Sequence, residues 1–322
     1  MSALRTMETV EWGIPRIPLG GWIEDIINWV KSTFRWFFNF IADVIEAAVN
    51  GLTDLLQWPP VLVTIVILAA IAWLVRDWKL ALGSVVGLLF IVSVDQWDNA
   101  MATLSLVLVA ALVALVIGIP LGILSARSET VSRVVRPVLD LMQTMPAFVW
   151  LIPTVMLFGL GVPAGTVATI VFALPPGVRL TELGIRQVDA EVVEAGQAFG
   201  GTPRQILGGI QMPLAMPTIM AGVNQVIMLA LSMAVIAGMV GGAGLGGAVI
   251  TAIQRFNVGL GFEAGLSVVV LAILLDRVTA AAGAGGLGRF KGRRRSRQDK
   301  DARQQSAESG DKSVGVHIAN GP

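Results

Sequence analysis

Apolar residues gather in seven stretches, separated by short segments that carry most of the charges. Most of the stretches approach the length of about 20 residues that a transmembrane helix needs. Gly118, Pro120 and Gly122 predict a kink in the third stretch, and we expect a glycine-rich loop at 241–263. The pattern predicts an all-α polytopic membrane protein with about seven transmembrane helices. The expected spans are 60–75, 80–94, 101–126, 137–160, 165–178, 214–240 and 264–282.

Residues 1–57 follow a different pattern. From Trp22 to Ala48 apolar residues recur at helical spacing, but Lys31, Arg35 and Asp43 interrupt them before they could span a bilayer. One interpretation is an amphipathic helix in the membrane interface, with Trp and Phe facing lipid. A helix packed on the protein's own core explains the pattern equally well.

Composition supports membrane insertion. Of the 322 residues 55% are hydrophobic and only 14% are charged, with a mean hydropathy of +0.75, whereas soluble domains carry about 25% charged residues. The absence of cysteine excludes disulfides and thiolate chemistry, and His317, the single histidine, lies in the polar segment 283–322. We expect that segment to be a disordered tail. Nothing at the N-terminus has the pattern of a removable signal peptide.

Basic residues predict the orientation, because Lys and Arg accumulate in cytoplasmic connections. Alternate connections are acidic or nearly uncharged, as at Asp95 and Asp98 or around Arg255 and Glu263. We therefore expect 179–212 and the C-terminus inside the cell and residues 1–57 outside. The basic side receives Arg76, Lys79, Arg127, Arg133, Arg136, Arg179, Arg186, Arg204 and the run 291–297.

The central parts of the expected spans from 101 to 275 hold no Asp, Glu, Lys or Arg, apart from Arg255 at a loop edge. Carriers driven by protons or sodium usually need such a group at mid-membrane. The sequence also lacks the G-x-x-x-x-G-K-[ST] phosphate loop of ATP-binding proteins. Uphill transport would therefore draw its energy from another protein, through a cytoplasmic contact.

The segment 194–213 reads E-A-G-Q-A-F-G-G-T-P-R-Q-I-L-G-G-I-Q-M-P. A short helix over 188–199 is expected to stop at Gly200 and Gly201, since glycine tolerates the left-handed turn. Thr202 and Gln205 then predict a capping box that begins a second helix. Such a two-helix unit suits docking on a partner.

This segment resembles the loop E-A-A-x3-G-x9-I-x-L-P of ABC importer permeases. Glu194, Ala195, Gly200, Ile210 and Pro213 match it, while Gly196 replaces an Ala and Met212 a Leu. The stretches 142–159 and 259–279 are similar to permeases of the glycine betaine/proline betaine (ProW/OpuA-type) importers, and the likeness covers about 60–282.

The resemblance implies a permease subunit that performs no chemistry. Its expected parts are an extracytoplasmic region 1–57, accessory spans in 58–99, a five-helix type I core in 100–282 with a coupling loop 188–213, and the tail 283–322. Expected partners are a second copy, two ATPase subunits that bind ATP and Mg²⁺, a separate extracytoplasmic binding protein and the lipid bilayer, but no nucleic acid. Choline or carnitine as cargo, or a passive osmolyte channel, remain alternatives.

Two further groups of residues have alternative interpretations. Met145, Pro146, Phe148 and Trp150 could line the translocation path, where aromatic faces attract methylammonium cations, or pack helices and anchor the membrane boundary. For the polar side chains inside 214–240 we expect hydrogen bonds between helices. These are Asn224, Gln225 and Ser232.

Overall fold

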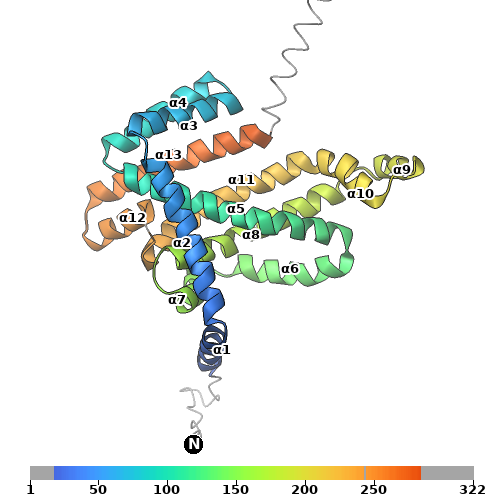
Figure 1. Ribbon diagram of the computed structural model, residues 1–322, viewed down its shortest axis with the longest axis horizontal. Coiled ribbons are helices and arrows are strands. Elements are labelled where there is room, and N and C mark those ends of the chain that lie inside the picture. The colour runs from blue at the N-terminus through green and yellow to red at the C-terminus, as the bar shows by residue number, and fades with distance from the viewer. Residues whose placement is uncertain (1–17, 243, 284–322) are drawn as a thin grey trace, which may run out of the picture.

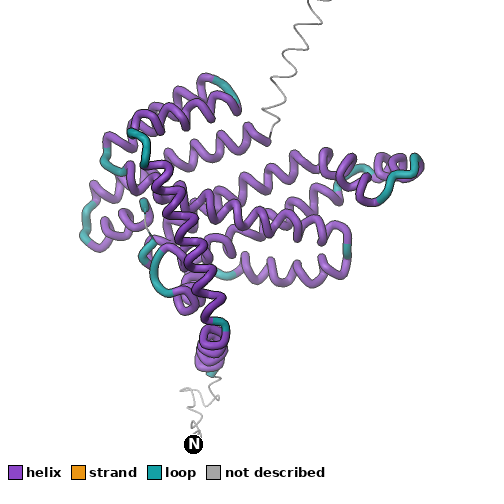
Figure 2. The backbone as a smooth tube through the Cα atoms, in the orientation of Figure 1, coloured by secondary structure: helices purple, strands orange, loops and turns teal. Residues whose placement is uncertain are grey.

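The computed structural model describes residues 18–242 and 244–283, and over these it is helical without strands (Figures 1 and 2). An all-α polytopic architecture is confirmed. The expected disordered tail lies outside the described residues, as does most of the N-terminal segment before α1 (Leu19–Thr33). By length and composition four helices can cross a membrane, or six when two sharply bent pairs are included. The remaining expected span, 80–94, corresponds to the shorter apolar helix α4 (Trp78–Ser93).

The N-terminal region forms two helices, α1 and α2 (Arg35–Gln57). No residue of α1 is buried, whereas α2 buries Ile45 and Val49 and packs against the core helices α5 and α8. A bend of 104° separates α2 from α3 (Val61–Val75), so α2 crosses the long helices in Figure 1. The second half of α2 thus packs on the core, as one interpretation expects, whereas α1 keeps an exposed amphipathic surface whose position in the membrane interface stays a prediction.

Four long helices make the centre of the bundle. These are α5 (Trp97–Arg127), α8 (Val162–Arg186), α11 (Met212–Ala237) and α13 (Val258–Gly283). Helix α8 extends well beyond the expected 165–178, because it continues through Pro175 and Pro176 and its last turns are held by ion pairs. The expected glycine-rich loop at 241–263 is partly wrong, since it contains helix α12 (Leu245–Gln254) after the short turn η3 (Gly238–Val240).

The span expected within 137–160 is not one straight helix. Helix α6 (Glu129–Thr144) begins at the cap of Ser128 and meets η1 (Ala147–Trp150) and α7 (Leu151–Phe158) at a bend of 107°. The cause is Pro146, whose ring disfavours the helical conformation of the residue before it. Met145 is accordingly extended, with φ −71° and ψ 133°.

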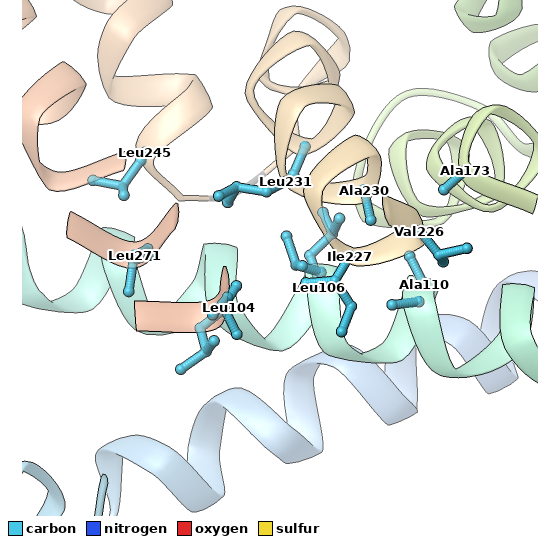
Figure 3. Close-up of a cluster of buried hydrophobic side chains, with 14 of the residues drawn as sticks. Leu104, Leu106, Ala110, Ala173, Val226, Ile227, Ala230, Leu231, Leu245 and Leu271 are labelled. Atoms are coloured by element: carbon cyan, nitrogen blue, oxygen red, sulfur yellow. The ribbon is translucent and has the colours of Figure 1, made fainter. Parts of the chain in front are cut away.

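The core joins these helices through aliphatic side chains and small residues. Around α5 the side chains of α8, α11, α12 and α13 converge (Figure 3). Gly122 shows how close the backbones come: an added Cβ would lie 2.6 Å from the carbonyl oxygen of Val178 in α8. Close approach at small residues is typical of helices packed in membranes. The labelled buried residues are Leu104, Leu106, Ala110, Ala173, Val226, Ile227, Ala230, Leu231, Leu245 and Leu271.

Candidate functional site

The loop 188–213 projects from the end of the bundle between α8 and α11 (Figure 1). It holds α9 (Ala190–Ala198), α10 (Pro203–Ile206) and one π-helical turn, η2 (Leu207–Gln211), which leads into α11. The expected capping box is confirmed: the backbone N–H of Thr202 donates to Oε1 of Gln205 at 2.8 Å, and that of Gln205 donates to Oγ1 of Thr202 at 3.4 Å. Helix–turn–helix geometry is therefore fixed locally.

The two helical parts of loop 188–213, α9 and the α10–η2 segment, contact each other at residues of the E-A-A motif. A Cβ added to Gly196 would lie 2.6 Å from Cδ1 of Ile210, so these positions, 14 residues apart, are in contact. Gly200 adopts φ +77°, as expected for the residue that turns the chain. Gly201 allows a close approach of two backbone segments, because a Cβ there would lie 2.7 Å from the carbonyl oxygen of Gly196. Ile206 is buried beneath the turn.

The outer surface of the loop combines charge with an apolar tip. Glu194, Ala195 and Pro213 are exposed. Phe199, at the end of α9, is 92% exposed and is the residue that the sequence argument did not assign to the site. The sequence does hold a sign of this exposure, because Phe199 comes just before two glycines at the tip of the loop, where an aromatic side chain has little core to enter. An exposed aromatic is a typical anchor for a protein partner.

A buried carboxylate fixes the base of the loop. Glu182 in α8 is 5% exposed, and its Oε1 accepts hydrogen bonds from Oγ of Ser132 at 2.8 Å and from Arg136 at 3.0 Å. Nε of Arg186 lies 3.0 Å from the same oxygen. The cluster joins α6 to α8 immediately before loop 188–213. Sequence reasoning missed it, because its members come from segments about 50 residues apart.

Arg186 extends the cluster to the start of α6. It donates to Glu129 and, at 2.8 Å, to the carbonyl oxygen of Ser125. The hydrogen bond from Arg186 and its positive charge lower the pKa of the exposed Glu129 from its ordinary value. The carboxylate is therefore ionised throughout the physiological range, and the pair links the α5–α6 turn to the end of α8.

Met145, Pro146, Phe148 and Trp150 lie at the corner between α6 and α7. Helix α6 has 16 residues and is about 24 Å long at 1.5 Å per residue, so the corner lies deep along the bundle. Nε1 of Trp150 donates to the carbonyl oxygen of Met142 at 3.3 Å. Phe148 is 50% exposed. Trp150 thus supports the corner, and Phe148 projects from it.

Polar contacts inside the bundle follow the expectation in part. Nδ2 of Asn224 in α11 donates to Oδ1 of Asp276 in α13 at 3.0 Å, and Thr279 also bonds to Asn224. The expected inter-helix bond of Ser232 is wrong, since its hydroxyl donates to Met228 in its own helix. Within 18–242 and 244–283 no three His, Asp or Glu side chains gather to hold a metal ion.

Comparisons with known proteins identify the family. The family model described as "Binding-protein-dependent transport system inner membrane component" matches residues 118–283. The chain is 47% identical over 266 residues to the glycine betaine transport system permease protein OpuAB of Bacillus subtilis, covering 83% of this chain and 94% of the relative. It is 49% identical to the glycine betaine/proline betaine permease ProW of Escherichia coli, covering 83% and 75%.

The glycine betaine/carnitine transport permease GbuB of Listeria monocytogenes is also 49% identical, with coverage of 83% and 96%. These relatives are named transport permease proteins and not enzymes. Inward-facing structures of the MetNI methionine ABC transporter share the fold, one with a TM-score of 0.53 at 24% identity over 57% of this chain and 92% of that one. The chain is thus a multi-pass bacterial membrane protein that belongs to the family of binding-protein-dependent transport system inner membrane components.

Proposed function

We propose that this chain is the permease subunit of an ATP-driven importer of glycine betaine and proline betaine. The observation that carries the proposal is the projecting loop 188–213, which presents the spaced motif of ABC importer permeases on an exposed two-helix unit. A passive channel has no use for such a unit. The cargo follows the names of the relatives, and because GbuB is named for carnitine as well, carnitine or choline is the alternative.

The proposed partners are those that the family requires. Two ATPase subunits, which bind ATP and Mg²⁺, dock on loop 188–213, with Glu194, Ala195, Gly196, Gly200, Ile210 and Pro213 forming or shaping the contact and Phe199 as its apolar anchor. A second copy of the chain completes the pathway, and a separate binding protein delivers cargo from outside. The N-terminus is outside and the C-terminus is cytoplasmic.

The division of labour along the chain follows the same scheme. Residues 1–57 form the outer region, 58–99 hold the accessory spans, 100–282 form the core and 283–322 the polar tail. ATP-driven closure of the ATPase dimer draws the two copies of loop 188–213 together and opens the core outward. Hydrolysis then returns the core to the inward-open state.

The corner between α6 and α7 is the proposed lining of the path. Interrupted backbone within a membrane is tolerated where it lies inside protein or lines a cavity, and interrupted helices often form transporter sites. Met145, Pro146, Phe148 and Trp150 occupy such an interruption. The exposed ring of Phe148 offers a methylammonium group a cation–π contact.

The test is uptake of radiolabelled glycine betaine, proline betaine, choline and carnitine by proteoliposomes that contain this chain with its ATPase and binding protein. We expect uphill uptake of the betaines only when ATP is present on the ATPase side. Passive flux without ATP would contradict the importer and favour a channel. ATP-dependent uptake of choline or carnitine alone would retain the mechanism and correct the cargo.

A further inference from the structure

A groove of about 410 Å³ lies between the first half of α4 and the second half of α13. Three cationic side chains line it, those of Arg76, Lys79 and Arg277, against one carboxylate, that of Asp77. It is separate from loop 188–213, from the corner at Pro146 and from the Glu182 cluster. The groove is therefore a feature that the transport mechanism leaves unexplained.

The carboxylate in the groove is already engaged. Oδ1 of Asp77 accepts the backbone N–H of Leu80 at 3.0 Å and so caps α4. Its other oxygen lies 4.0 Å from Nε of Arg76, and Arg277 is at the same distance from Asp276. Exposed pairs at this separation contribute little, and a guanidinium has five N–H donors. Each arginine therefore retains donors for another anion.

Behind the cations the groove becomes apolar. At Gly87 the helices touch, because an added Cβ would lie 2.7 Å from Cγ1 of Val270. One turn closer to the cations, at Gly83, a Cβ would meet nothing within 4 Å, so the space beside this residue is open. Leu80 and Ile273 contribute apolar walls. A cationic mouth above a narrow apolar slot matches a phosphate headgroup and the start of an acyl chain.

The mouth lies at the expected level of the membrane surface. Trp73 and Trp78, on either side of the α3–α4 turn, are both more than 60% exposed, and tryptophan concentrates at membrane–water boundaries. Leu82 and Val86 of α4 and Ile273 of α13 are exposed apolar residues near the groove. With the α3–α4 hairpin placed in the membrane as the sequence predicts, such residues face acyl chains and the groove opens to the bilayer.

We propose that this groove binds one anionic phospholipid. Its phosphate lies among Arg76, Lys79 and Arg277, and one acyl chain follows Gly83 towards Gly87. Arg76, Lys79 and Arg277 outnumber the lining Asp77 and the neighbouring Asp276, and this excess of positive charge selects an anionic over a zwitterionic headgroup, as basic pockets between membrane helices do. The bound lipid joins the α3–α4 hairpin to α13.

The test reconstitutes the full chain in nanodiscs of phosphatidylcholine with a minor fraction of phosphatidylglycerol. After extraction in mild detergent, mass spectrometry counts the lipids retained. Each basic residue near a membrane surface contributes to binding anionic lipid, so the triple variant Arg76→Gln/Lys79→Gln/Arg277→Gln is expected to retain at least about 10-fold less phosphatidylglycerol. Arg133→Gln, which removes an exposed cation outside the groove, should retain as much as the unaltered chain.

A second variant tests the apolar slot without altering charge. Gly83→Leu fills the groove and should reduce retention of phosphatidylglycerol to a similar extent. The control Gly265→Leu, at a helical glycine of α13 that also has open space around it, should not reduce it. Inorganic phosphate at millimolar concentration should leave the lipid bound. Displacement by phosphate would overturn the lipid assignment in favour of a soluble anion. Equal retention of phosphatidylcholine, or unchanged retention in both groove variants, would overturn the site.

Discussion

The contact between Gly196 and Ile210 shows what the loop motif means at the scale of single residues. The spacing in the sequence identified both positions, but it did not show that they touch across the turn. Gly196 stands where the family usually has Ala, and the one atom that an added methyl group would approach too closely is Cδ1 at the flexible end of Ile210. This departure is therefore one that a small movement of a side chain accommodates. Phe199 escaped the motif altogether, because its role depends on exposure, which sequence does not encode.

Gly200→Val is expected to reduce ATP-dependent uptake by more than 10-fold while the chain still enters the membrane. The reason is φ +77° at Gly200, a conformation that a β-branched residue adopts only with strain. Uptake and the amount of chain in the membrane fraction are measured together. Gly51→Val, at a helical glycine with open space around it, is the control. Loss of membrane insertion in Gly200→Val would contradict the docking role.

Phe199→Ala is expected to weaken binding of the ATPase subunit by about 30-fold, which corresponds to about 2 kcal/mol for an aromatic anchor. The matched control is Phe256→Ala, because Phe256 is also 92% exposed but follows α12 instead of α9. Affinity of the detergent-solubilised complex is the measurement. Equal affinities for both variants would remove Phe199 from the contact.

At the scale of elements, apolar runs identified where helices lie but not where they bend or end. The corner at Met145–Pro146 follows from a local proline rule that hydrophobicity does not register. Helix α8 was expected to end near Val178, where the polar stretch 179–212 begins. Instead Glu182 is buried by partners on α6 and on its own helix. Long-range pairing of this kind cannot be inferred from one sequence.

Glu182→Gln is expected to lower the free energy of unfolding by about 1.5–3 kcal/mol, the range for hydrogen bonds to a charged group. The substitution removes the negative charge that balances Arg136 and Arg186. Thermal unfolding in detergent measures the change. Asp140→Asn breaks only the exposed pair with Arg179 and should cost at most about 1 kcal/mol. Similar melting temperatures for the two variants would contradict the structural role of Glu182.

The contact between Glu129 and Arg186 predicts a pH dependence. The hydrogen bond from Arg186 lowers the pKa of Glu129 from its ordinary value. The stabilisation from the pair is therefore fully present above the ordinary pKa and is lost as the pH falls through the lowered one. The difference in melting temperature between the unaltered chain and Glu129→Gln should be constant from pH 8 to pH 5 and shrink below pH 4.5. A difference that grows on acidification would refute this assignment.

At the scale of the whole molecule, the alternation of charged connections was enough to order the spans and to place loop 188–213 at one end of the bundle, where Figure 1 shows it. It was not enough to position α2 across the bundle or to find α12 in a glycine-rich connection. Both depend on contacts with α5 that join distant segments, such as the bond from the backbone N–H of Leu245 to Oγ1 of Thr103.

The proposed orientation can be tested directly because the chain has no cysteine. Single cysteines at Arg204 and at Phe256 should react oppositely with a membrane-impermeant maleimide. Arg204→Cys is expected to react only after the cells are permeabilised, and Phe256→Cys in intact cells. Reversed labelling would invert the topology, and labelling of both in intact cells would contradict the assignment of the spans between them.

The continuity of the chain from α10 to η3 has a mechanical consequence. Helical structure runs without a break from Pro203 to Val240, 38 residues, or about 57 Å at 1.5 Å per residue. At its far end a Cβ on Gly238 would lie 2.2 Å from the carbonyl carbon of Gly246, so the backbones of η3 and α12 meet with no side chain between them. A displacement applied at Pro203 is therefore expected to be transmitted along the helix to α12, because no side chain lies between the two backbones to absorb the movement.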